Sequence, residues 1–197
     1  MTAIIVVGVG LIVYSRNEAL HPTAAKVGPS LTDNWQAALG IDICGTIEPN
    51  LPASANLSTT GLRTFGNGLI DAAPDVSSAP SKFEGAKATL GLFAKNYSGF
   101  TLTSTQLGYP GKHEKIYKKG EACTGKVTGK GTLVARVWAS PTARSSKLVD
   151  NPTTVHITNG EMITVAFVPS GTTIPQPPSK GALETAIGSP SSGSKKK

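Results

Sequence analysis

Two Asn-Gly pairs lie between short apolar runs of this chain, and they constrain its fold more than any other feature. They are Asn67-Gly68 and Asn159-Gly160. Both residues of such a pair tolerate the positive φ angles of a tight hairpin turn. We therefore predict antiparallel hairpins, with strands over 62–65 and 69–72 around the first pair. The second hairpin is expected within "TVHITNGEMITVAFVP".

Other segments have the period of a strand or a helix. "TLVARVWA" alternates, which places Leu133, Ala135 and Val137 on one face of a strand and Val134, Arg136 and Trp138 on the other. "AKATLGLFAKNYSG" predicts a helix with Leu90, Phe93 and Ala94 on one side. "NWQAALGI" predicts a short amphipathic helix that ends at Gly40, and "IDICG" a strand.

Composition sets the domain limits. The chain has 22 Gly and 14 Pro with 39% hydrophobic residues, which indicates many turns or unstructured segments. We expect a linker over residues 16–29, an extracytoplasmic domain over 30–169, and a flexible tail with a basic tip over 170–197. The expected fold is α+β: a strand-dominant single domain with antiparallel hairpins and one or two short helices, preceded by an N-terminal membrane segment.

The start of the chain, "MTAIIVVGVGLIVYSRNEALHP", is apolar from Ala3 to Tyr14. A dinucleotide-binding loop is disfavoured, because Val13 replaces the third glycine and prolines interrupt the helix that should follow. A membrane anchor over residues 1–15 fits better, although the run is shorter than the roughly 20 residues that span a bilayer. We expect an anchor clipped at its start, and a buried first strand remains the alternative.

A lysine-rich segment carries much of the positive charge outside the C-terminus. The formal net charge is +7, and the last three residues are all lysines. Lysines that lie near Tyr109 and Tyr117 are candidates for contact with an anionic partner: Lys112, Lys115, Lys118, Lys119 and Lys126. Nucleic acid is not the expected partner, because the segment has no arginine and no recognition motif. A solvated loop is the alternative.

Residues with catalytic or metal-binding chemistry are scattered. Gly-x-Ser-x-Gly is absent, and the carboxylates have no paired spacing. Two cysteines and three scattered histidines do not form a zinc pattern, so we expect no catalytic residue, cofactor or metal. Cys44 and Cys123 are compatible with one disulfide in an oxidising compartment, or with two unrelated buried thiols.

Four stretches, "GPSLTDNWQAALGIDICG", "TTGLRTFGNGLID", "KATLGLFAKNYSGFTLT" and "NGEMITVAFVPSGTTIPQPPS", resemble a family of uncharacterised actinobacterial membrane-anchored extracytoplasmic proteins. The resemblance covers about Val27 to Ser179 and implies the same location for this chain. Cys44 and Cys123 stand where the family carries cysteines, which implies a disulfide between them. Arg63 and Phe65 stand where the family hairpin carries histidines, so the resemblance implies no metal site here.

The function we expect is that of a membrane-anchored extracytoplasmic binding or scaffolding protein of the bacterial envelope. Its expected partners are other envelope proteins or an anionic envelope polymer, reached through the lysine-rich loop or the proline-rich tail. The membrane itself is contacted through residues 1–15. The alternative is an envelope enzyme or folding factor that acts on prolyl bonds or thiols.

Overall fold

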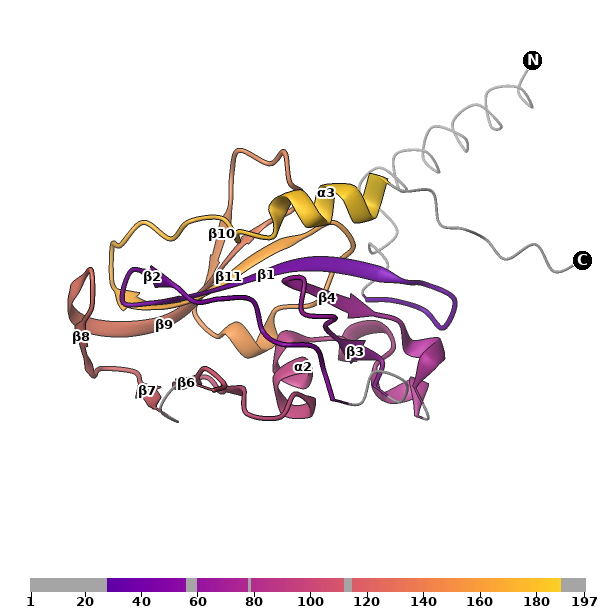
Figure 1. Cartoon of the computed structure of the whole chain (residues 1–197), viewed down its shortest axis with the longest axis horizontal. Coiled ribbons are helices and arrows are strands. Elements are labelled where there is room, and N and C mark those ends of the chain that lie inside the picture. The colour runs from indigo at the N-terminus through magenta and orange to yellow at the C-terminus, as the bar shows by residue number, and fades with distance from the viewer. Residues whose placement is uncertain (1–27, 56–59, 78, 112–114, 189–197) are drawn as a thin grey trace, which may run out of the picture.

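Strand β11 (Met162–Pro169) lies in the middle of the main sheet and organises it. It pairs antiparallel with β9 (Thr128–Trp138) and parallel with β1 (Trp35–Ile43). Almost every residue of β1 and β11 is buried, as expected for strands with both faces covered. The computed structural model describes residues 28–55, 60–77, 79–111 and 115–188 as a strand-dominant α+β fold (Figure 1).

The remaining strands are short. The main sheet runs in the order β10-β9-β11-β1-β4-β3, with β2 on β1 and β8 on β9, while β5, β6 and β7 form a second sheet. Their bounds are β2 Thr46–Ile47, β3 Leu62–Arg63, β4 Leu69–Ala72, β5 Thr101–Leu102, β6 Gln106–Gly108, β7 Ile116–Lys118, β8 Ala122–Thr124 and β10 Lys147–Val149.

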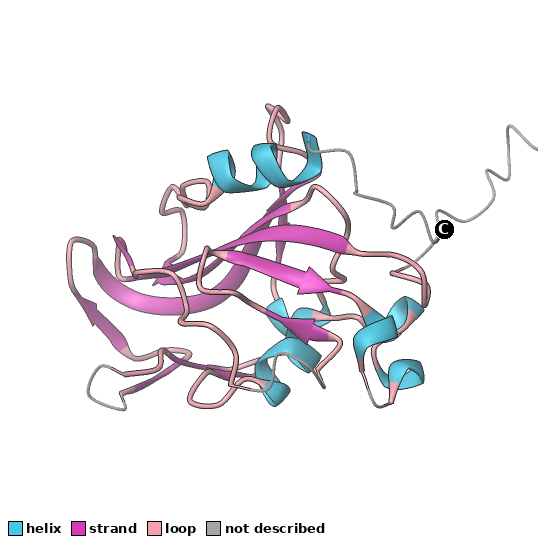
Figure 2. Cartoon of the chain, turned by 45° about the vertical axis from the view of Figure 1, so that its right-hand side comes forward, coloured by secondary structure: helices cyan, strands magenta, loops and turns pink. Residues whose placement is uncertain are grey.

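Two α-helices cover opposite faces of the main sheet (Figures 1 and 2). Helix α2 (Leu90–Asn96) begins at Thr89, whose side chain accepts a hydrogen bond from the Leu92 N–H. Helix α3 (Lys180–Gly188) lies over the other face. Single 3₁₀ turns complete the fold: η1 Pro74–Val76, η2 Pro80–Lys82, η3 Gly85–Lys87 and η4 Pro152–Thr154.

The two faces of the sheet have separate cores, and the alternation predicted for β9 is confirmed. Leu133 and Ala135 pack in the larger core with Phe93 of α2. On the opposite face, Trp138 packs with Leu183 of α3, and Val134 packs in a third cluster. The buried side of α2 is Leu90, Phe93 and Ala94, as the sequence predicts.

The helix predicted within "NWQAALGI" is wrong, because these residues open strand β1. Leu39, Ile41 and Ile43 face the larger core, while Ala38 and Gly40 face the other side. A Cβ at Gly40 would lie only 3.0 Å from the Pro177 Cα, so the chain crossing that face requires a small residue. Because Ala38 and Gly40 are small, the sequence of β1 does not show the clear alternation of large apolar and polar residues that predicts a strand.

The first Asn-Gly hairpin is confirmed, although β3 is shorter than expected. Leu62 pairs with Ala72 and Arg63 with Asp71, and residues 64–68 lie between the two strands. The positive φ angles of this turn fall on Gly66 and Gly68 and not on Asn67, so the turn differs from the one expected of an Asn-Gly pair.

The second Asn-Gly hairpin is wrong, although a turn is present: the Glu161 N–H donates to the Thr158 carbonyl. The preceding segment pairs instead with the chain before α2, where the Ile157 N–H donates to Ala88 and the Leu90 N–H to Val155, both at 2.8 Å. The reason is that β9 and β1 already occupy both edges of β11.

The expected flexible tail is wrong for residues 170–188, which cross the sheet and end in α3. The Thr164 hydroxyl donates to the Pro175 carbonyl at 2.8 Å, and the Ser179 hydroxyl donates to the Gly68 carbonyl at 2.9 Å. Leu183 is fully buried. The apolar face of the sheet supplies most of the buried surface, so a segment with few large residues is sufficient to cover it.

The predicted anchor over residues 1–15, most of the linker (residues 16–27) and the basic tip (residues 189–197) lie outside the described residues. In the part of the chain that the structure describes, no helix combines the length and the apolar character needed to cross a bilayer.

Replacing Leu183 with alanine tests whether α3 is part of the folded domain. We expect Leu183→Ala to lower the free energy of unfolding by about 2–5 kcal/mol, because it leaves a cavity in a fully buried contact. Denaturant unfolding of the full chain measures the change. Glu184→Ala, on the exposed side of α3, is the control and should change stability by less than about 0.5 kcal/mol. Equal losses of stability for Leu183→Ala and Glu184→Ala would contradict the packing of Leu183 against the sheet.

Candidate binding surface

A disulfide joins Cys44, directly after β1, to Cys123 of β8, as expected. The Cα atoms are 5.3 Å apart, and both residues are buried. Cys44 has a φ of 52°, a left-handed conformation uncommon for a residue other than glycine. Hydrogen bonds hold this turn, since the Cys44 N–H donates to Phe167 and its carbonyl accepts from Val127. The bridge closes a separation of 79 residues, and such bridges typically stabilise by about 2–4 kcal/mol.

The predicted lysines lie on separate parts of the surface. Lys115, Lys118, Lys119 and Lys126 are exposed, and Lys112 lies outside the described residues. Lys115 lines a hollow with Tyr109 and Pro110, and its Nζ is 4.6 Å from the centre of the Tyr117 ring. Lys126 lies against the Gly45 turn. Lys119 lines a groove on the face of the sheet that carries α3.

That groove, called the β9 groove here, has a volume of about 320 Å³. Its floor is the part of β9 that carries Thr132, Val134 and Arg136. Residues 168–174 form one wall, and Leu148 and Asp150, in and after β10, form the other. The β9 groove therefore lies between the last strand of the sheet and the segment that leads to α3.

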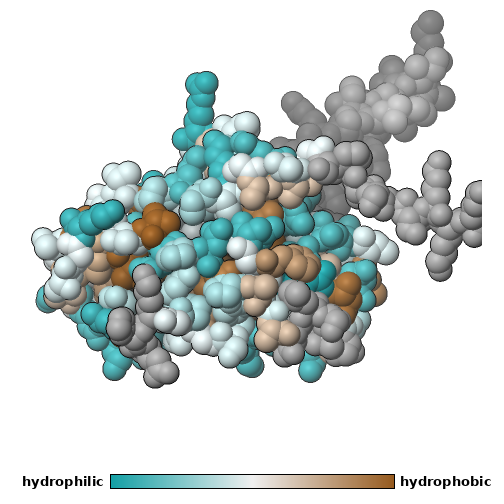
Figure 3. All heavy atoms as spheres, viewed as in Figure 1, coloured by the Kyte–Doolittle hydropathy of each residue, from teal (hydrophilic) through white to brown (hydrophobic). Residues whose placement is uncertain are grey.

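The β9 groove combines apolar walls with an excess of positive charge. Leu148 is 50% exposed, whereas Ile174 on the opposite wall is only 4% exposed and packs with Val134 and Val168. Lys119 and Arg136 are its cations, and Asp150 is the acid that lines it. On the side of the molecule shown in Figure 3, apolar residues (brown) reach the surface in separate spots among polar ones.

Arg136 has unused hydrogen-bonding capacity in the β9 groove. Its Nη1 donates to the Ser146 hydroxyl at 3.2 Å. Its Nε is buried and has no hydrogen-bond partner among the described residues. A guanidinium has five N–H donors in a planar fork that matches a carboxylate. Because Nε is buried, the Nη nitrogens are the donors that Arg136 can offer to a carboxylate in the groove.

Sequence reasoning did not identify the β9 groove. The alternation of β9 placed Val134, Arg136 and Trp138 on one face, and this was the available signal. No motif marks that face, because the groove also needs β10 and the segment from residue 168 to 174. Most of that segment was assigned to a flexible tail.

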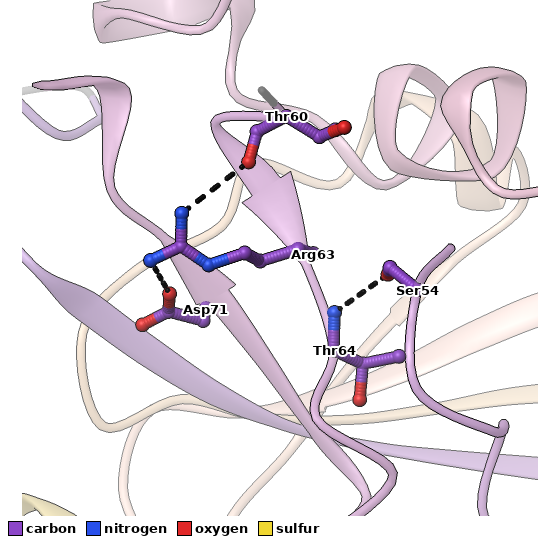
Figure 4. Close-up of polar contacts among 5 residues, drawn as sticks. All are labelled: Ser54, Thr60, Arg63, Thr64 and Asp71. Carbon is purple, nitrogen blue, oxygen red and sulfur yellow. Dashed lines mark hydrogen bonds and ion pairs between the residues drawn. The ribbon is translucent and has the colours of Figure 1, made fainter. Parts of the chain in front are cut away.

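The β3–β4 hairpin is held by an ion pair. A guanidinium nitrogen of Arg63 lies 2.7 Å from a carboxylate oxygen of Asp71, and Arg63 also donates to the Thr60 carbonyl (Figure 4). Burial raises the pKa of Asp71, and the charge of Arg63 opposes that rise. Within the described residues, no three His, Cys, Asp or Glu side chains converge into a metal-binding group.

Two further carboxylates are buried outside the β9 groove. Asp42 is 1% exposed, and its Oδ1 has no hydrogen-bond partner among the described residues. Burial raises the pKa of Asp42, and a backbone hydrogen bond from Gly45 opposes the rise. Burial also raises the pKa of Glu161 from 4.5 to about 7, which a hydrogen bond with the Thr158 side chain opposes. Glu161 is therefore the group expected to couple stability to pH near neutrality.

We expect the contribution of Glu161 to stability to fall as the pH rises from about 4.5 to about 7. In this window the folded protein keeps a proton that the unfolded chain has lost. Above about pH 7 the loss of stability caused by Glu161 is constant and amounts to at most about 3 kcal/mol. Glu161→Gln should remove this pH-dependent loss of stability, so that the variant becomes more stable than the parent chain as the pH rises.

Urea unfolding of both proteins between pH 4 and pH 8 measures this difference. Glu184→Gln, on the exposed side of α3, is the matched control and should leave the pH dependence unchanged. Parallel stability curves for Glu161→Gln and the parent chain would contradict a protonated Glu161.

Comparison with known proteins gives no relative from which to transfer a role to these residues. No family model matches the chain, and neither a curated protein nor a solved structure matches it. The chemistry of the β9 groove therefore has to be argued from its own residues.

Proposed function

We propose that this chain is a binding protein of the bacterial envelope. In this proposal residues 1–15 anchor it in the membrane, and its folded domain lies on the extracytoplasmic side. The β9 groove binds an extended acidic segment of another envelope protein. The observation that carries the proposal is the position of Arg136, on the floor of the groove beside the half-exposed Leu148.

The disulfide supports the proposed location. Disulfides form and persist in oxidising compartments and are rare where thiols are kept reduced. Cys44 and Cys123 are joined and buried, and the bridge connects the main sheet to the lysine-bearing segment. The apolar run from Ala3 to Tyr14 supports a membrane anchor on the N-terminal side of the domain.

The composition of the β9 groove favours a polypeptide over an anionic polymer. A polymer of phosphates or acidic sugars would satisfy Lys119 and Arg136 but would cover the half-exposed Leu148 with polar groups. An extended polypeptide supplies a carboxylate for Arg136 and apolar side chains for the walls. The volume of about 320 Å³ lies at the lower end of the usual range for ligand sites.

The charged groups of the β9 groove favour binding over catalysis. General acid–base catalysis needs a group whose pKa lies near the working pH. Lysine and arginine side chains remain charged at neutral pH. Glu161, whose pKa burial raises to about 7, does not line the groove. The groove therefore has Lys119 and Arg136 as cations and Asp150 as its acid, an arrangement suited to holding an anionic partner.

Binding of a model peptide tests the groove. The probe is a short fluorescent peptide of alternating glutamate and leucine, and polarisation with the full chain in detergent measures its affinity. We expect Arg136→Ala to weaken binding at least about tenfold, because it removes a charge-assisted hydrogen bond. Leu148→Ser should also weaken it. Lys130→Ala, an exposed lysine outside the groove, is the matched control and should leave affinity unchanged.

Two outcomes would count against a protein partner in the β9 groove. Undiminished binding by Arg136→Ala would show that the peptide binds elsewhere. Equal affinity for a polyglutamate peptide without leucine would favour an anionic polymer, because the apolar walls would then contribute nothing.

Labelling of intact cells tests the location separately. We expect a membrane-impermeant amine reagent to modify Lys115 in bacteria that produce the full chain, because this exposed lysine lies on the proposed extracytoplasmic domain. Mass spectrometry at Lys115 measures the modification, and a cytoplasmic protein serves as the unlabelled control. Protection of Lys115 until the membrane is permeabilised would place the domain on the opposite side.

A further inference from the structure

A second group of lysines surrounds helix α2, on the opposite face of the main sheet from the β9 groove. These residues form a shallow, open area, called the α2 surface here. It is lined by Lys82, Lys87, Thr89, Gly91, Leu92 and Lys95. Glu84 is the only acid within residues 82–95, and it does not line this surface. The α2 surface is therefore strongly basic, with Leu92 as its apolar centre.

The chain enters the folded domain beside this surface. Gly28, the first described residue, has a φ of 83°, and a Cβ there would overlap the Gly85 carbonyl. The Gly85 N–H donates to the Pro29 carbonyl at 2.8 Å. Gly85 begins the turn η3, and η3 ends at Lys87. The segment that leads back to the proposed anchor thus joins the domain two residues from a lysine of the α2 surface.

We propose that the α2 surface contacts the anionic phospholipid headgroups of the membrane that holds residues 1–15. This inference rests on the proposed membrane anchor. The contact orients the domain so that the β9 groove, on the other face of the sheet, points away from the bilayer and toward its partner.

The length of chain before the domain is compatible with such a contact. Residues 16–27 separate the expected anchor from Gly28. Twelve residues span at most about 40 Å even when fully extended. The surface beside Gly28 is therefore held near the headgroups at high effective concentration. Basic side chains are attracted to an anionic bilayer within about one Debye length, roughly 8 Å at physiological salt.

The lysine side chains suit phospholipid headgroups. A lysine ammonium has three donors and binds phosphate as a point charge without a fixed geometry. The Lys87 Nζ donates to the Ser81 carbonyl at 2.9 Å, which holds it at the surface and leaves donors for a headgroup. Lys82 and Lys95 line the same area, and Leu92 lies between the charges. Three cations on one open face favour a flat anionic surface over a single small anion.

Hydrogen exchange of the full chain in lipid nanodiscs tests the inference. One set of discs contains phosphatidylcholine alone, and the other contains phosphatidylcholine with phosphatidylglycerol. We expect exchange across residues 85–96 to be several-fold slower in the anionic discs, with the difference reduced in high salt. Replacing Lys82, Lys87 and Lys95 together with glutamate should abolish the difference.

The matched control replaces three exposed basic residues outside the α2 surface, Lys130, Arg144 and Lys147, with glutamate. This variant carries the same change in net charge and should keep the protection. Thermal unfolding in detergent establishes that both triple variants are folded. Loss of protection in the control would show a general charge effect and overturn the inference.

Failure of this inference is distinguishable from failure of the proposed function. Co-purification with the discs but equal exchange in both lipids would overturn the headgroup contact and leave the anchor and the groove standing. Failure to co-purify with any disc would remove the anchor, and the headgroup contact with it. The affinity of the β9 groove for the model peptide is measured in detergent and is independent of both results.

Discussion

The parallel pairing of β1 with β11 is the interaction on which the rest of the structure depends. It runs from Ala38 opposite Met162 to Ile43 opposite Phe167 and joins the beginning of the domain to its end. With β9 on the other edge of β11, the centre of the sheet has its main-chain groups paired on both sides. Both faces of this centre are apolar, so each has to be covered. Helix α2 covers one face, and residues 170–188 cover the other.

Those parts of the fold whose pattern is local were predictable from the sequence. The alternation of β9, the hairpin at Asn67-Gly68 and the buried side of α2 each follow from a few neighbouring residues. Three predictions failed because distant partners decide the outcome. The alternation of β1 is hard to recognise in the sequence because one of its faces carries small residues. The second hairpin does not form because β1 and β9 already pair with both edges of β11. The tail is ordered by an apolar face that lies elsewhere in the sequence.

The candidate site shows the same division. The cysteine pair was expected, and Lys115, Lys118, Lys119 and Lys126 are exposed. The β9 groove could not be predicted, because its floor and walls come from three segments that only the sheet brings together. Arg136 is an ordinary strand residue in the sequence. It becomes a candidate anion-binding group because Leu148 lies beside it on β10 and Ile174 faces it from the segment before α3.

The β9 groove is rigid on its floor and adjustable at its walls. Arg136 lies opposite both Thr164 and Leu148, so its backbone is fixed by strands on either side. The wall of residues 168–174 is held to the sheet by the Thr164–Pro175 hydrogen bond, and Ser179 bonds to Gly68 before α3 begins. A binding site with a fixed floor loses little conformational entropy when a partner docks. The hydrogen bonds that lead the chain into α3 therefore also hold this wall of the groove in place, which links the order of the last described residues to binding.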